Sequence, residues 1–164
     1  MISTKRWWTT LAVIALGLFL LISVAQAEQP YDITVCGSGT VTLLTQSKEL
    51  TIMSIDYKGI ARSNHENKFL DNCTMHHVRV HCIAAGKVTS SHGFTKFMAP
   101  DGDCVFVEVS VVGGETIAKL FAGTGKWKGI TGLGKIIRLA RGKPIAPGTL
   151  QGCVRNTGTF ELPK

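Results

Sequence analysis

Residues 105–121, VFVEVSVVGGETIAKLF, contain two strand patterns and the turn between them. Valines at 105, 107, 109 and 111 alternate with other residues, which is the period-two pattern of a strand with one buried face. Gly113 and Gly114 connect this run to a second strand-forming run, as in a tight β-hairpin. The stretch predicts two antiparallel strands with the valine face in the core and Glu108 pointing outward.

The chain beyond residue 27 repeats this kind of signal. Valine, isoleucine and threonine are frequent, and helix-period apolar stripes are missing, so we expect an all-β fold. Turn signals separate candidate strands near residues 31–36, 39–45, 50–62, 73–84, 88–98, 103–112, 115–122, 134–140 and 149–161. Eight or nine short strands imply a sandwich or a barrel. We favour the closed barrel, because closure removes exposed strand edges.

The N-terminal segment, MISTKRWWTTLAVIALGLFLLISVAQA, has the three parts of a secretory signal peptide at residues 1–27. Lys5 and Arg6 precede an apolar run, and Ala25-Gln26-Ala27 matches an A-x-A cleavage site. The run is short for a membrane span, and an uncleaved anchor is the alternative. We expect cleavage after Ala27, a single domain at residues 28–164, and a secreted or periplasmic location.

All five cysteines follow the predicted signal peptide, in a compartment that permits disulfides. They are Cys36, Cys73, Cys82, Cys104 and Cys153. Two disulfides and one unpaired, buried thiol form the simplest arrangement, and the sequence leaves the pairing open. Cys36 and Cys153 could join the first and last strands of a closed sheet. Cys73 and Cys82 cannot pair along one extended strand, because nine residues separate them by ~30 Å.

Histidines are concentrated in the strand expected at residues 73–84. His76 shares a face with Val78, Val80 and Cys82, so we expect this face inward and His76 as a polar group inside an apolar lumen. His77 and His81 are then expected to point outward together with Arg79. Four residues along a strand place two Cα atoms ~13 Å apart, so these two histidines do not predict a metal site.

Positive charge is concentrated in the C-terminal part of the chain. The full chain has a formal net charge of +7, and residues 119–155 contain lysines and arginines but no acidic residue. Within this region Trp127 lies between Lys126 and Lys128, a basic and aromatic cluster. The pattern favours a solubilising exterior, and the alternative is a surface for anionic envelope lipids, polysaccharide or a small anion. Nucleic acid is a poor candidate for an exported protein.

Residues 121–135, FAGTGKWKGITGLGK, are rich in glycine but lack the G-x-x-x-x-G-K-[ST] pattern of a phosphate loop. Such glycines permit positive φ and close approach of strands. The segment resembles the G-[GS/T]-G-x-[FW] turn of the allene oxide cyclase and dirigent-like barrel families. The hairpin at Gly113-Gly114 precedes it as in those families. The turn at 101–103 and the ending at 148–162 resemble small exported bacterial members.

This resemblance covers about residues 80–164. It implies an antiparallel, eight-stranded, calycin-like (allene oxide cyclase-like) barrel that forms dimers or trimers. No catalytic residue carries over from the plant families, so the motif supports the fold and not the chemistry.

We therefore expect an exported barrel that binds a small apolar or anionic ligand without catalysis, with no cofactor and no metal. An envelope surface contact and a homo-oligomer are further expectations. One alternative is a cyclase- or isomerase-like enzyme acting in the lumen, and another is a structural or host-interaction oligomer. Glu108 would have a raised pKa and could exchange protons if it pointed inward. The candidate ligand-binding residues are His76, Glu108, Lys126, Trp127 and Lys128.

Overall fold

The computed structural model describes residues 28–163. The predicted signal peptide, residues 1–27, lies outside the described residues. Across 28–163, no helix has the length and apolar character needed to cross a bilayer.

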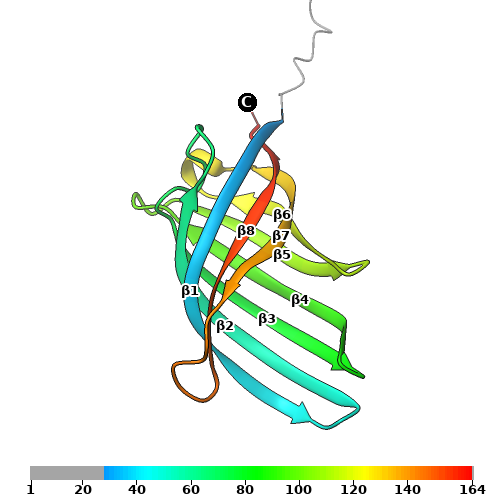
Figure 1. The fold of residues 1–164 in the computed structure, drawn as a ribbon. Helices are drawn as coiled ribbons and strands as arrows, with labels where there is room; N and C mark the ends of the chain where they lie inside the picture. The colour runs from blue at the N-terminus through cyan, green and yellow to red at the C-terminus, as the bar shows by residue number, and fades with distance from the viewer. Residues whose placement is uncertain (1–27, 164) are drawn as a thin grey trace, which may run out of the picture.

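Eight strands form one closed antiparallel barrel, and each strand pairs with its neighbours in chain order until β8 pairs with β1 (Figure 1). The strands are β1 (Gln29–Gln46), β2 (Leu50–Ser63), β3 (Thr74–Ala84), β4 (Lys87–Met98), β5 (Cys104–Val112), β6 (Glu115–Gly123), β7 (Thr131–Arg141) and β8 (Thr149–Glu161). A single 3₁₀ turn, η1 (Gly125–Trp127), follows β6. The predicted all-β, eight-stranded antiparallel barrel is confirmed.

The two strands expected at 31–36 and 39–45 are one continuous strand, β1. Gly37 and Gly39 do not form the expected turn. They lie in the ladder opposite Gly59 and Tyr57 of β2. A Cβ on Gly37 would lie 2.1 Å from the carbonyl oxygen of Lys58. These glycines therefore allow close packing of β1 against β2. The sequence pattern predicts a turn between two strands instead, and that prediction is wrong.

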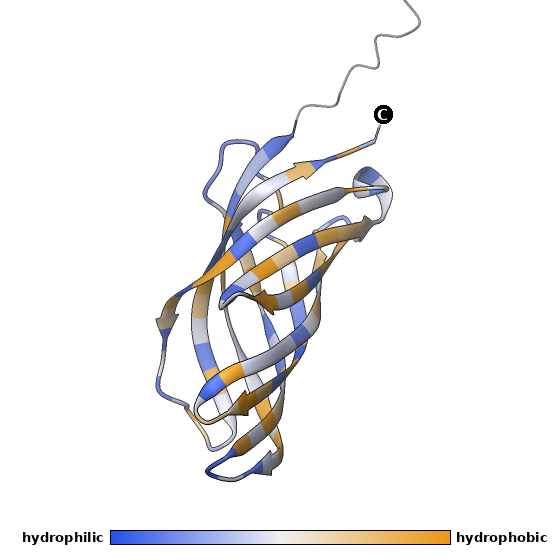
Figure 2. Cartoon of the chain, turned by 90° about the vertical axis from the view of Figure 1, so that its right-hand side faces the viewer, coloured by the Kyte–Doolittle hydropathy of each residue, from blue (hydrophilic) through white to orange (hydrophobic). Residues whose placement is uncertain are grey.

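The barrel has two different ends. The start of β1, the end of β8, the β2–β3 loop and η1 lie at one of them, which we call the packed end (Figure 1). Its interior is filled by aromatic side chains from four separate segments, with Phe69 and Phe160 stacked at 4.1 Å between ring centroids. The ring centroids of Tyr31 and Trp127 lie 5.4 and 6.2 Å from the ring centroid of Phe69. Apolar and polar residues alternate along the strands, as the barrel wall requires (Figure 2).

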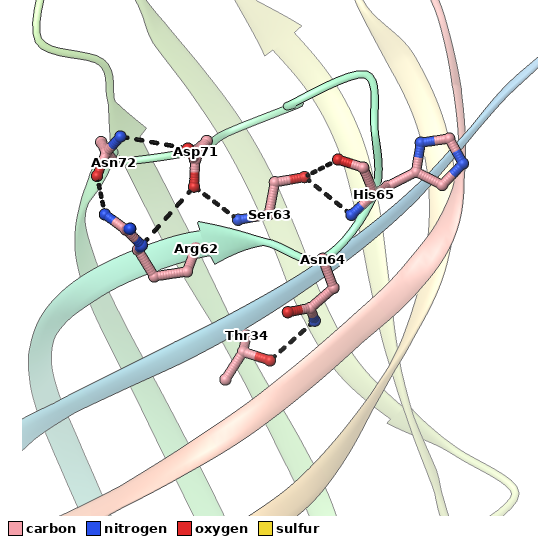
Figure 3. Close-up of polar contacts among 7 residues, drawn as sticks. All are labelled: Thr34, Arg62, Ser63, Asn64, His65, Asp71 and Asn72. Carbon is pink, nitrogen blue, oxygen red and sulfur yellow. Dashed lines mark hydrogen bonds and ion pairs between the residues drawn. The ribbon is translucent and has the colours of Figure 1, made fainter.

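Polar contacts fix the β2–β3 loop across the packed end (Figure 3). The Asp71 carboxylate accepts a hydrogen bond from the Ser63 backbone N–H at 2.9 Å and lies 3.9 Å from the Arg62 guanidinium. Asn64 donates to the hydroxyl of Thr34 in β1 at 2.9 Å. The loop therefore holds Phe69 inside the barrel by bonds to both β1 and β2.

One disulfide joins Cys36 of β1 to Cys153 of β8, residues that are direct partners in the strand ladder. It closes the barrel between the first and last strands, as the sequence suggested. The expectation of a second disulfide is wrong for residues 28–163, since Cys73, Cys82 and Cys104 are all unpaired. Cys73 and Cys104 are buried as small apolar side chains, and burial raises the pKa of the Cys73 thiol to about 11.

Candidate functional site

The half of the barrel away from the packed end contains a cavity of about 370 Å³. It extends from Phe97 and Asn156 inside the barrel to Val41, Ile83 and Val88 near the loops of the opposite end, which we call the open end. Most of its wall consists of apolar side chains, which include Met53, Ile55, Met75, Val109, Ile136, Leu150 and Val154. A mostly apolar cavity of this size suits a small organic molecule.

Arg79 of β3 is the central polar group of this cavity. It lies in the ladder between Ile55 of β2 and Gly93 of β4. Its guanidinium Nε donates a hydrogen bond of 2.5 Å to the hydroxyl of the buried Ser91. Burial lowers the pKa of Arg79, although a guanidinium stays charged at any physiological pH.

This arginine has no acidic counterpart in the cavity. No aspartate or glutamate of the described residues lines the wall, and none forms an ion pair with Arg79. Arg138 and Arg141 of β7 add two more guanidinium groups to the lining. A partly buried positive charge without a carboxylate is costly, so the cavity is electrostatically suited to an anion.

Two histidines accompany Arg79 on the inner face of β3. His77 shares a hydrogen bond of 2.7 Å between its Nδ1 and the hydroxyl of buried Thr95. Burial, reinforced by the positive charge of Arg79, lowers the pKa of His77 to about 4. Burial together with Arg79 and Arg138 lowers the pKa of His81 to about 4 as well. Both imidazoles are therefore neutral at pH 7, and the positive charge of the cavity comes from its arginines.

Two hydrogen-bonded tyrosines lie toward the inner boundary of the cavity. Tyr57 donates from its hydroxyl to the Gly152 carbonyl oxygen at 2.6 Å. Tyr31 donates to the Asn156 side-chain oxygen at 3.2 Å, and burial raises the pKa of Tyr31. These bonds occupy the phenol protons, so the charged donors on the cavity wall are the guanidinium groups.

The predicted orientation of β3 is wrong, and with it the placement of His76 inside the lumen. His76 is exposed on the outer surface, where its Nε2 lies 3.0 Å from the Asp56 carboxylate. His77 and His81, expected outside, line the cavity instead. The outward valines misled the prediction, because a barrel half with an open cavity does not need apolar residues at every inward position. The useful signal was Met75, which is buried and fixes the inner face of the strand.

Glu108 points outward, as its alternation with the buried valines predicted. Its carboxylate lies 2.9 Å from His92 Nε2 on the neighbouring strand. It is remote from the cavity lining and does not take part in that site.

Lys126, Trp127 and Lys128 lie at the packed end rather than beside the cavity. Trp127 is buried in the core rather than exposed between the two lysines. Lys126 forms an ion pair of 2.5 Å with Asp101 and lies 4.6 Å from the centre of the Trp127 ring. Lys128 is exposed. The structure therefore does not bring this cluster together with His76 or Glu108.

Comparison with known proteins gives a likeness in fold. No protein-family model matches the chain, and no curated protein matches it. Among solved structures, the barrel is similar to the pterocarpan synthase dirigent protein GePTS1, with a TM-score of 0.51 and 10% sequence identity. The match covers 84% of this chain and 93% of that chain. At this identity the likeness shows a shared dirigent-like barrel fold.

Proposed function

We propose that this exported barrel binds a small amphiphilic anion in its open-end cavity and does not transform it. The observation that carries the proposal is Arg79, a partly buried guanidinium without a carboxylate partner in a largely apolar cavity. A carboxylate or sulfate group would complete the hydrogen bonding of the guanidinium, and an apolar tail would cover the aliphatic wall. The ligand class is therefore both apolar and anionic.

Export and the structural likeness support the proposal from different directions. The N-terminal sequence predicts secretion or a periplasmic location, and a disulfide such as Cys36–Cys153 is typical of oxidising compartments. The similar solved structure is named as a synthase and a dirigent protein. Its name suggests small-molecule chemistry in a barrel of this type, and the cavity of the present chain offers a comparable place for a small molecule.

The test is a titration with three probes that share a ten-carbon chain: decanoate, decanol and decyltrimethylammonium. We expect decanoate to bind with one molecule per barrel, decanol to bind at least about tenfold more weakly, and the cation not to bind. Arg79→Gln should weaken decanoate binding by about tenfold or more, because a charge-assisted hydrogen bond is lost. The same variant should change decanol binding little.

Lys128→Gln is the matched control, since it removes one positive charge at the packed end, away from the cavity. It should leave decanoate binding unchanged. Equal loss in both variants would mean that net charge, and not the cavity, attracts the anion. If Lys128→Gln binds decanoate as the unmodified protein does, native mass spectrometry is the next step. Protein purified from its own envelope fraction should carry the natural cargo as an added mass.

A second candidate is a cyclase- or isomerase-like activity, favoured by the neutral histidines beside Arg79. A neutral imidazole can accept a proton, and a guanidinium can stabilise the anion that results. Incubation of the extracted cargo with the protein in D₂O separates the two candidates. Deuterium incorporation that His81→Gln abolishes would support catalysis, whereas cargo of unchanged mass supports binding alone.

A further inference from the structure

The open end carries large apolar side chains on its loops and strand ends. Leu44 is 80% exposed and lies at an irregularity in the β1–β2 ladder, while Ile145 in the β7–β8 loop is 82% exposed. Leu43, Leu50 and Val88 are further exposed apolar side chains in the same region. Such side chains are costly in water when they gather at one place, so the group needs an explanation.

These segments form one continuous rim. The backbone N–H of Ala85 donates to the Glu49 carbonyl oxygen at 3.0 Å, which joins the β3–β4 turn to the β1–β2 loop. The N–H of Val41 donates to the Gly148 carbonyl oxygen at 2.7 Å, which joins β1 to the β7–β8 loop. All three connections lie at the end of the barrel opposite the end of β8 (Figure 1). We call residues 43–50, 84–88 and 138–148 the open rim.

The open rim is strongly basic. It carries Lys48, Lys87, Arg138, Arg141 and Lys143 against a single acidic residue, Glu49. None of these five cations forms an ion pair within residues 28–163. Two cations at the packed end, in contrast, have carboxylate partners, in the pairs Lys126–Asp101 and Arg155–Asp32. Lys68 and Lys128 at that end form no ion pair within residues 28–163. Five cations without an ion pair therefore lie together beside the cavity.

We propose that the open rim docks on the surface of a bilayer rich in anionic lipid. Leu44 and Ile145 enter the headgroup region, and the lysines and arginines contact lipid phosphates. Interleaved cations and protruding apolar tips on separate loops fit a fluid interface of this kind. A soluble polyanion would use the cations and leave the apolar tips in water.

Docking in this orientation turns the mouth of the cavity toward the membrane. Arg138 and Arg141 belong both to the rim and to the cavity lining, so an anionic headgroup held at the rim lies next to the binding site. An amphiphile can then pass between bilayer and cavity without crossing water. This last step rests on the proposed ligand binding, whereas docking itself does not depend on it.

The test is co-sedimentation of the exported protein with vesicles of phosphatidylcholine, with and without about 30% phosphatidylglycerol, at about 0.1 M salt. We expect binding to the anionic vesicles and at least about tenfold weaker binding to the neutral ones. The double variant Leu44→Ser/Ile145→Ser and the double variant Lys87→Gln/Lys143→Gln should each weaken vesicle binding severalfold. Lys128→Gln at the packed end is the control and should bind as the unmodified protein does.

Three outcomes would overturn docking. The protein could fail to bind vesicles, or it could bind neutral and anionic vesicles equally well. The third is that Lys128→Gln weakens vesicle binding as much as the two double variants do. Binding to dextran sulfate that matches vesicle binding and is insensitive to Leu44→Ser/Ile145→Ser would identify a polyanion partner instead. Arg79→Gln separates the two proposals, because it should dock normally while failing to take up decanoate. If the unmodified protein binds vesicles but does not bind decanoate, only the proposed ligand is refuted.

Discussion

His77 makes the stability of the barrel depend on pH. Its pKa is about 4 in the folded protein, against about 6.5 in an unfolded chain, so the unfolded state binds more protons between these values. The contribution of neutral His77 is complete above pH 6.5 and is lost as the pH falls toward 4. Between pH 7 and pH 4.5, the unfolding free energy of the His77→Gln variant should fall by about 2 kcal/mol less than that of the unmodified protein, as measured by denaturant unfolding at both pH values.

Val78, the exposed and outward-facing neighbour of His77 on the same strand, gives the matched control for this experiment. Val78→Gln introduces the same side chain without removing a titratable group, so the pH dependence of unfolding should stay close to that of the unmodified protein. If both variants follow the same pH profile as the unmodified chain, protonation of His77 is not linked to folding.

Gly134 is a residue at which a single methyl group should disturb the packed core. A Cβ there would lie 2.0 Å from the Tyr31 hydroxyl oxygen and 2.8 Å from the Asn156 side-chain oxygen. We expect Gly134→Ala to cost about 2–4 kcal/mol of unfolding free energy, because both groups belong to a buried hydrogen bond. Gly142→Ala is the control: its Cβ would be 3.5 Å from its nearest neighbour, and its effect should stay below about 1 kcal/mol. Similar losses in both variants would argue against a steric cause at Gly134.

The sequence predicted the direction of a side chain correctly where the inner face of the strand is apolar and buried. It predicted the direction wrongly where the inner face of the strand lines the cavity. The alternation around Glu108 gave the correct outer face, because its inward neighbours Val107 and Val109 are buried. On β3 the outward Val78 and Val80 are as apolar as a core, while the inward positions carry His77 and Arg79. A cavity with polar side chains on its wall reverses the usual rule, so His77 and Arg79 were assigned to the wrong face.

At the scale of elements, the Cys36–Cys153 disulfide closes the last seam of the barrel. It links positions 117 residues apart, and a constraint over a loop of that length removes substantial entropy from the unfolded chain. We expect Cys36→Ser/Cys153→Ser to lower the unfolding free energy by about 2–5 kcal/mol in guanidinium titrations under oxidising conditions. Cys82→Ser, which removes an unpaired and partly buried thiol, should change it by less than about 1 kcal/mol.

The boundaries of most strands followed from turn residues, since Gly113-Gly114 and the segment at 100–103 do end strands. Gly37 and Gly39 show the limit of this reasoning. In the sequence, a glycine that allows two strands to approach closely looks the same as a glycine that forms a turn. The two roles can be told apart only when the position of the partner strand is known.

At the scale of the whole molecule, five cations that form no ion pair within residues 28–163 gather at the open end. The sequence indicated a basic C-terminal region but drew attention to Lys126 and Lys128. Lys126 is in fact neutralised by Asp101, and its backbone N–H donates to Asp103. Those acids precede it by more than twenty residues, so only the closed fold shows which cations remain unpaired.

The division into a packed end and an open end should be visible in amide hydrogen exchange. Strand β1 spans both, with buried Tyr31, Ile33 and Val35 in its first half and exposed side chains from Thr42 onward. We expect slow exchange at residues 31–35 and faster exchange at 42–46, because local opening follows the loss of buried contacts. Equal protection along β1 would contradict the two-ended description.

Ligand and membrane should then protect different parts of the open end. Decanoate should slow exchange at residues 77–83 and raise the melting temperature, as any ligand specific for the folded state does. Anionic vesicles should slow exchange at residues 43–50 and 143–148 instead. In Arg79→Gln the decanoate effect should vanish, while the vesicle effect and the gradient along β1 persist. Loss of all three together would mean that Arg79 supports the fold itself, and its role in recognising an anion would have to be abandoned.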